Sequence, residues 1–433
     1  MTPLNVGIIG ICVLLVLLFS RMPIGFVMGL VGFAGFAYLT SFEGGLGVLR
    51  TVVYSTFADY GLSVIPLFIL MGSFCFFAGL SKDLYDTVHS WFGQLRGGLA
   101  MATVSACAGF PAISGSSLAT AATMGTVSLP EMKRYKYDDR LATGAVAAGG
   151  TIGILIPPSV ILILYGIITE QSIGKLFLAG FIPGVLEAVF YMVTIYILCT
   201  SNPFMGPPGP RTSFMDKITS LKNTWIVLVL FVLVIGGIYL GVFSPTEAAG
   251  VGAFGAFIFG LARKRLGWKA FTSSLAETGK TTAMVFVIIL GAMILGYFLA
   301  VSRIPFVLAD IVGALAVNRY IILVLILLVY LFLGCVMDSM AIMLLITPIF
   351  FPLSISLGFN PIWFGILITR MTEIGLITPP VGLNVYIIRG VAKDVPMQTI
   401  FRGIIPFLIA DICHVALLIA LPQISLFLPG FMK

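Results

Sequence analysis

Apolar segments close to membrane-spanning length recur along the whole chain, and this pattern constrains the fold more than any other feature. They include residues 6–20, 24–39, 62–80, 176–199, 225–240, 284–301 and 404–421. Only 9% of the 433 residues are charged, against roughly 25% in soluble domains. A globular protein so poor in charge could not cover itself with a wetted surface. The sequence therefore predicts an all-α, polytopic membrane protein.

The basic residues indicate how the chain enters the membrane. They gather in four loops, at residues 133–140, 211–222, 263–269 and 389–402. Membrane proteins keep Lys and Arg in cytoplasmic loops, which explains the net charge of +7 without a nucleic-acid partner. Arg21 follows the first apolar segment, so the N-terminus is expected on the periplasmic side. All four loops are cytoplasmic only if two segments, about 98–130 and 320–352, are re-entrant hairpins.

An internal repeat becomes visible when the sequence is shifted by 222 residues. The matching positions are Ser117 with Ser339, Pro130 with Pro352, Gly153 with Gly375, and Pro157-Pro158 with Pro379-Pro380. Apart from the serines, these positions hold proline, which restricts the backbone, or glycine, which gives it more freedom. Such residues are hard to align by chance. The basic loops make the two halves enter the membrane in opposite directions. The sequence thus predicts an inverted-topology repeat, the architecture of many secondary transporters.

The repeat divides the chain into five expected regions. They are 1–96, scaffold and connector of the first half; 97–199, the first hairpin, a broken helix and the following span; 200–222, a cytoplasmic linker; 223–276, scaffold of the second half; and 277–433, transport elements with the second hairpin, broken helix and last span.

Two proline pairs predict the broken helices. Pro157-Pro158 and Pro379-Pro380 each remove two backbone donors, at about 3 kcal/mol or more per proline in a continuous helix. Each segment is expected to form two half-helices joined by an unwound link. Exposed carbonyls at that depth need protein, water or an ion as partner. The alternative reading is a pair of proline kinks closed by small residues for helix packing.

The hairpin tips add polar groups to these links. Residues 112–117 and 334–339 are polar breaks inside apolar segments, and each places a helix N-terminus where it favours an anionic ligand. Asp338 is the strongest single polar candidate for the binding site, because a charged side chain inside the membrane costs free energy. Arg303 is the residue that we expect to bind a substrate carboxylate. The alternative is that Arg303 only extends its charged end to the membrane interface. Arg370 and Glu373, three residues apart, are expected to pair.

Several motifs together carry a family resemblance. They are Gly109-Phe-Pro-Ala-Ile-Ser-Gly-Ser-Ser117 followed by Pro130-Glu-Met, Gly153-Ile-Leu-Ile-Pro157-Pro158, Phe243-Ser-Pro-Thr-Glu247-Ala-Ala and Gly375-Leu-Ile-Thr-Pro379-Pro380-Val-Gly-Leu-Asn384. Over essentially the whole chain, the sequence resembles the large membrane subunit of the tripartite ATP-independent periplasmic (TRAP) transporters. Of the Glu247 motif itself, the residues indicate only a capped first helical turn.

The resemblance implies a function and a set of partners. It implies an elevator-type carrier in the bacterial inner membrane that takes up a small organic acid, such as sialic acid or a C4-dicarboxylate, together with sodium. A small four-helix membrane subunit, as a separate chain, and a periplasmic binding protein would be its partners. Sodium is the only expected metal, and no organic cofactor or enzymatic activity is expected.

The resemblance also implies site residues. The first sodium site would use Ser114, Gly115, Ser116 and Ser117 with Gly153 and Pro157. The second would use Gly334, Gly375, Thr378 and Val381. Ser117, Arg303 and Asp338 would face the substrate.

Three rival functions stay open on the residues alone. One is a stand-alone sodium/dicarboxylate carrier of the same fold. Another is an intramembrane serine hydrolase built on Ser114-Gly115, for which His414 is the available base. The third is a channel, although broken helices and hairpins favour alternating access.

Overall fold

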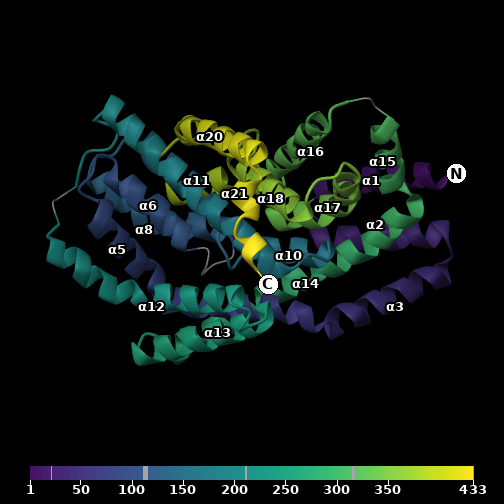
Figure 1. Ribbon diagram of the computed structural model, residues 1–433, viewed down its shortest axis with the longest axis horizontal. Helices are drawn as coiled ribbons and strands as arrows, with labels where there is room; N and C mark the ends of the chain where they lie inside the picture. The colour runs from purple at the N-terminus through teal and green to yellow at the C-terminus, as the bar shows by residue number, and fades with distance from the viewer. Residues whose placement is uncertain (21, 111–115, 210–211, 315–316, 433) are drawn as a thin grey trace.

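The computed structural model describes residues 1–20, 22–110, 116–209, 212–314 and 317–432, and within these ranges it contains helices and no strand (Figure 1). The first half consists of α1 (Pro3–Phe19), α2 (Ile24–Leu39), α3 (Phe42–Ala58), η1 (Tyr60–Ser63), α4 (Val64–Phe77), α5 (Leu80–Phe92), α6 (Gly98–Gly109), α8 (Ser117–Arg134), α9 (Asp139–Ile152), α10 (Val160–Ile168) and α11 (Ile173–Ser201).

The second half follows the same order. It consists of α12 (Phe214–Tyr239), α13 (Pro245–Ala262), α14 (Trp268–Ser302), α15 (Ile304–Ala314), α16 (Arg319–Gly334), α17 (Ser339–Ser356), α18 (Pro361–Ile377), α19 (Leu383–Val391), α20 (Met397–Ala420), α21 (Gln423–Leu426) and η2 (Pro429–Phe431).

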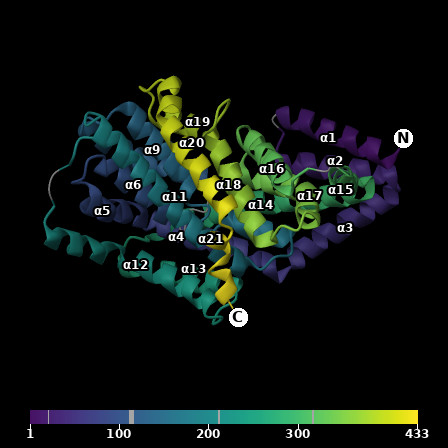
Figure 2. The same ribbon diagram turned by 45° about the horizontal axis from the view of Figure 1, so that its top comes forward.

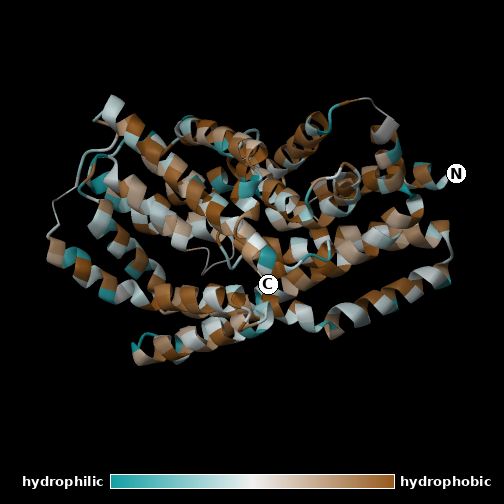
Figure 3. Cartoon of the chain, viewed as in Figure 1, coloured by the Kyte–Doolittle hydropathy of each residue, from teal (hydrophilic) through white to brown (hydrophobic). Residues whose placement is uncertain are grey.

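Length and surface character both confirm a polytopic membrane protein. Six helices of the described chain are long and apolar enough to cross a membrane, or up to seven if the bent pair Phe214–Lys222 and Thr224–Tyr239 is one span. Apolar residues run along most of the helical surface that Figure 3 presents. Large apolar side chains point outward from several helices, among them Phe57, Val232, Phe332 and Ile412. A lipid environment would cover such surfaces, whereas water would not.

An outer group of helices, α1–α4 with α12–α14, forms one layer of the molecule. The 35-residue α14 packs along α2 and also touches α1, α3 and α4, while α13 packs on α4 and α12. Close packing of α14 on α2 depends on glycine, because a Cβ on Gly291 would lie 2.1 Å from the Gly25 carbonyl oxygen. Helices α12, α13 and α3 mark the lower edge of Figure 1.

An inner group, α6–α11 with α16–α20, holds both proline links. Helix α9 packs against α6, α8 and α20, and α18 packs against α11, α16, α17 and α20. Helix α20 crosses between α9 and α11 on one side and α18 on the other (Figure 2). Each half thus supplies elements to one shared interior.

The helix boundaries recur along the chain with the spacing seen in the sequence. Helices α8 and α17 begin at residues 117 and 339, and α9 and α18 begin at residues 139 and 361, an offset of 222 in both cases. Helices α10 and α19 are both nine residues long. The opposite membrane orientation of the two halves stays a prediction.

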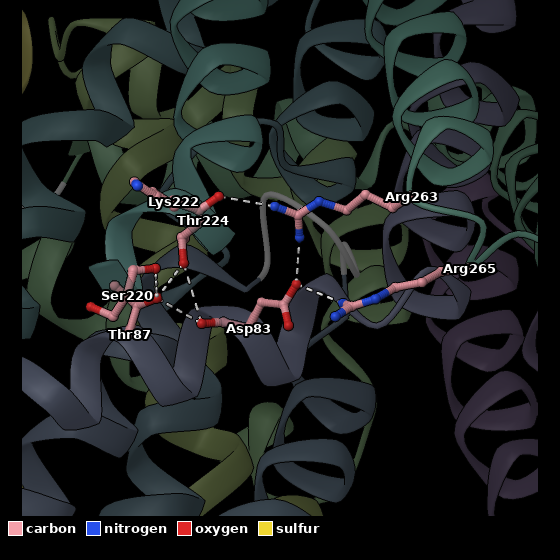
Figure 4. A network of polar contacts seen from close by, with 7 residues as sticks. All are labelled: Asp83, Thr87, Ser220, Lys222, Thr224, Arg263 and Arg265. Atoms are coloured by element: carbon pink, nitrogen blue, oxygen red, sulfur yellow. Dashed lines mark hydrogen bonds and ion pairs between the residues drawn. The ribbon is translucent and has the colours of Figure 1, made fainter. Parts of the chain in front are cut away.

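Helix α5 connects the two groups, because it packs on α6 of the inner group and α12 of the outer group. A polar network holds it to α12 and the end of α13 (Figure 4). The Asp83 carboxylate accepts hydrogen bonds from Arg263 at 2.7 Å and Arg265 at 2.6 Å. On the next turn, the Thr87 hydroxyl donates to the Asp83 carbonyl and contacts the Thr224 hydroxyl. Helix α5 is therefore anchored to the outer group.

Some boundaries differ from those expected. Helix α12 begins at Phe214, inside the predicted linker 200–222, because Ser213 and Asp216 form a capping box there. Helix α14 runs unbroken across the predicted boundary at 276/277, since no proline interrupts it. Pro130 and Pro352 lie inside α8 and α17 and do not end them. The capped turn expected at Glu247 is confirmed, with Ser244 as its capping partner.

Candidate functional site

The first hairpin tip precedes α8. Ser116 caps this helix by accepting a hydrogen bond from the Ala119 N–H at 3.3 Å, and Ser117 is its first residue and is buried. A backbone N–H at this position has no partner within the helix, so it is available to an anion. The predicted sodium ligands Ser114 and Gly115 lie outside the described residues.

The second tip joins α16 to α17. Helix α16 ends at Gly334, and the Asp338 carboxylate caps α17 by accepting from the Met340 N–H at 3.1 Å. Ser339, the first residue of α17, is buried like its counterpart Ser117. The two tips therefore place equivalent serines at the starts of equivalent helices.

One buried carboxylate joins the two tips. The Ser117 hydroxyl donates to Oε2 of Glu373 at 2.5 Å, and the Ser339 hydroxyl donates to Oε1 at 2.7 Å. Glu373 lies on α18 and has no exposed surface. The expected pairing of Glu373 with Arg370 is wrong: within the described chain, the ion pairs of Arg370 are made with carboxylates on other helices. A three-residue spacing on a buried helix did not identify the partner, because neighbouring helices supply better-placed groups.

The proline links form the other side of the site. Residues 153–159 separate α9 from α10, and residues 378–382 separate α18 from α19, so both broken helices are confirmed. Each contains a cis peptide bond, Pro157-Pro158 and Pro379-Pro380. The first link is buried throughout. In the second link, the Thr378 hydroxyl donates to the Ile374 carbonyl at 2.6 Å and is partly buried.

The second link touches the second tip. The N–H of Gly382 donates to the Cys335 carbonyl at 3.1 Å. A Cβ on Gly375 would lie 2.5 Å from the Cα of Gly334, so the two glycines let the backbones meet. The structure thus brings together Gly334 and Gly375, two residues expected in the second sodium site. Sodium binding at this contact stays a prediction.

A charged cluster lies beneath the tips. Arg370 on α18 contacts the carboxylates of Glu187 on α11, at 2.8 Å, and Asp411 on α20, and it donates to the Tyr191 hydroxyl at 3.2 Å. All three charged side chains have no exposed surface. The cluster ties α11, α18 and α20 together. Glu187 and Asp411 were missed by sequence reasoning, although each is a charge inside a long apolar segment and could have been found on that ground.

A cavity of about 520 Å³ separates the tips from the outer group. Its lining includes Ser73 of α4, Ser116 at the N-cap of α8, Glu277 and Thr281 of α14, and Met340 of α17. This volume is in the range of small-molecule sites. The cavity therefore opens beside both helix N-termini.

Arg303 lies apart from this arrangement. It is the exposed C-cap residue of α14, in the left-handed conformation with φ of 58°, and it is followed directly by α15. Helix α15 packs against α17 and α1. Among the contacts given by the described residues, none joins Arg303 to the two serines or to Glu373. Its predicted role in substrate binding stays a prediction.

Known proteins are similar to this chain over most of its length. A family described as "Tripartite ATP-independent periplasmic transporter, DctM component" matches residues 11–424. The C4-dicarboxylate TRAP transporter large permease protein DctM of Pseudomonas aeruginosa is 38% identical, over 89% of this chain and 90% of the relative. The sialic acid TRAP transporter large permease protein SiaM of Vibrio cholerae is 35% identical, over 95% and 96%.

A solved structure supports the fold independently. The YdaH transporter of Alcanivorax borkumensis, described as having an unusual topology, superimposes with a TM-score of 0.61. It covers 90% of this chain and 89% of that chain at 17% identity, so the likeness concerns the fold alone. From the match along residues 11–424 and the two relatives, the chain belongs to the TRAP transporter family, as a large permease protein of the DctM type.

Proposed function

We propose that the chain carries a small organic acid across the bacterial inner membrane by sodium-coupled secondary transport. The observation that carries this proposal is the convergence of both hairpin tips on Glu373. Two tips and two unwound links around one interior supply carbonyl and hydroxyl oxygens for a cation, and helix N-termini for an anion.

The substrate is an organic acid with one or more carboxylates. The relatives are named for C4-dicarboxylates and sialic acid, both of which are acids. In our proposal the acid enters the 520 Å³ cavity and meets the N-termini of α8 and α17. The backbone N–H of Ser117 faces the substrate, Asp338 lies beside it, and Arg303 reaches the carboxylate when the inner and outer groups change position.

Sodium occupies two sites in this proposal. The first lies between Ser114–Ser117 and the link at Gly153 and Pro157. The second lies between Gly334 and the link at Gly375, Thr378 and Val381. The oxygen of Thr378 keeps its lone pairs available, since its hydroxyl proton is used in the bond to Ile374.

The motion is of the elevator type. The inner group would slide past the outer group, with α5 and α15 as the connecting arms. Two features support this division: the cavity lies between the groups, and α5 packs on both. The chain acts with a separate small membrane subunit and a periplasmic binding protein, in agreement with the word "large" in the names of both relatives.

The test is uptake by liposomes that contain this chain and its small subunit. Radiolabelled organic acids would be supplied with and without an inward sodium gradient and with and without the cognate binding protein. We expect uptake only when both are present. Uptake that needs sodium alone would identify a stand-alone carrier, and uptake that ignores sodium would overturn the coupling.

A further inference from the structure

The hydroxyl groups of Ser117 and Ser339 are both bound to the same carboxylate, and this fixes where their protons point. An ionised carboxylate only accepts hydrogen bonds, whereas a serine hydroxyl has one proton to donate and two lone pairs. Both serines lie within hydrogen-bond distance of Glu373, at 2.5 and 2.7 Å. With Glu373 ionised, each hydroxyl proton points to Glu373, and each serine oxygen turns only lone pairs to its other neighbours.

We propose that Glu373 is a positioning residue that turns the Ser117 and Ser339 oxygens into acceptors for bound sodium, Ser117 at the first hairpin tip and Ser339 at the second. This inference rests on the proposed sodium coupling. An oxygen with outward lone pairs suits a hard cation and offers nothing to a substrate carboxylate. The serine side chains then serve the cation, while the N-terminal ends of α8 and α17 serve the anionic substrate.

The surroundings of Glu373 favour this role. Arg370, one helical turn away, forms its ion pairs with Glu187 and Asp411 and, within the described chain, makes no ion pair with Glu373. Its carboxylate, fully buried, is left with two neutral donors. A buried carboxylate is costly unless it is paired. The two serine hydroxyls are therefore the groups through which Glu373 acts on its surroundings.

The first experiment replaces the carboxylate by an amide of the same shape. In Glu373→Gln the amide oxygen accepts from one serine, but the amide nitrogen donates to the other and forces that serine to turn its proton outward. We expect the sodium concentration for half-maximal uptake to rise about tenfold, while the substrate KM at saturating sodium changes less than twofold. Glu43→Gln, at an exposed position on α3, is the matched control and should behave as wild type.

A double-mutant cycle separates positioning from a simple charge effect. If Glu373 acts through the serines, Glu373→Gln has no further effect on sodium half-saturation in a Ser117→Ala/Ser339→Ala background. An equal effect in both backgrounds would mean that the charge acts directly, and the proposal would fall. Sodium-induced stabilisation of the purified complex against heat, without substrate, measures the same shift independently of uptake.

Three further outcomes are decisive. If Glu373→Gln does not fold, the single variants Ser117→Ala and Ser339→Ala still test the proposal, and an unchanged sodium dependence in both would overturn it. Wild-type uptake that ignores sodium would overturn the proposed function itself. Sodium-dependent wild-type uptake with no change in Glu373→Gln would overturn only the role of Glu373.

Discussion

Gly334 and Gly375 pack backbone to backbone: a Cβ on Gly375 would lie 2.5 Å from both the Cα and the carbonyl carbon of Gly334. One residue ends α16 and the other lies in the last turn of α18, just before the proline link. The contact therefore sets how closely the second hairpin tip approaches the second link. Any side chain at either position has to push the two elements apart.

This contact predicts the effect of Gly375→Ala. The added methyl group meets backbone atoms that cannot rotate away, and overpacking of this kind costs about 1–3 kcal/mol. We expect a lower melting temperature of the purified protein in detergent and a strong loss of sodium-driven uptake. Gly390→Ala on α19 is the control, because its Cβ would have nothing within 4 Å. Equal behaviour of the two variants would show that the close approach is not needed.

The buried cluster around Arg370 predicts a large effect on stability. Removing one member of a buried ion pair leaves the remaining charges without compensation, at about 3–5 kcal/mol. Arg370→Met should therefore lower the melting temperature sharply, because Glu187 and Asp411 lose their shared partner. Arg50→Met, at an exposed position on α3, should leave it unchanged.

The same cluster allows a rescue experiment. Neutralising both acids together with the arginine, as Arg370→Met/Glu187→Gln/Asp411→Asn, should recover much of the lost melting temperature. Buried ion pairs can often be replaced by neutral groups at little cost. A triple variant as unstable as Arg370→Met alone would show that packing, and not uncompensated charge, causes the loss.

The sequence predicted the architecture because its strongest signals are local. Pro157-Pro158 and Pro379-Pro380 each remove two backbone donors from the chain. In the structure, one helix ends before each pair and another begins after it. Contacts between helices leave weaker signals in the sequence than these local features do. That Ser117 and Ser339 meet on Glu373 depends on how α8, α17 and α18 pack, and no spacing along the chain encodes it. The mistaken Arg370–Glu373 pair has the same cause.

Asp338 is the N-cap of α17, and in the proposed function it is also a charge at the transport site. Asn caps a helix about as well as Asp, whereas Ala loses about 1 kcal/mol. We expect Asp338→Asn to lose uptake at an unchanged melting temperature, and Asp338→Ala to lose uptake with a slightly lower one. Undiminished uptake by the Asn variant would remove the charge from the transport site.

The Thr378 hydroxyl is expected to bind sodium through its oxygen. Thr378→Val keeps the shape of the side chain and removes that oxygen, so the sodium concentration for half-maximal uptake should rise. Thr126→Val on α8 is a close control, because that hydroxyl is exposed and also donates to a carbonyl of its own helix, at 2.7 Å. The assignment fails if both variants keep the wild-type sodium dependence.

The Asp83 network predicts what happens when α5 loses its anchor. The Asp83 side chain is 10% exposed and binds Arg263 and Arg265, which are 21% and 45% exposed. Hydrogen bonds between charged groups contribute about 1.5–3 kcal/mol when they are shielded from water, and the exposure of Arg265 places this network at the lower end. Asp83→Asn should lower both the melting temperature and the maximal uptake rate.

The control for Asp83→Asn is an ion pair that is exposed to solvent. Lys133 and Asp394 join α8 to the loop after α19, but their side chains are 68% and 60% exposed. Water and salt screen such a pair, so Asp394→Asn should change neither quantity. If α5 is the arm on which the inner group moves, only the Asp83 variant slows transport, and raising the salt concentration does not reproduce its effect in wild type. Equal uptake rates in the two variants would mean that the inner group does not need α5 to be fixed.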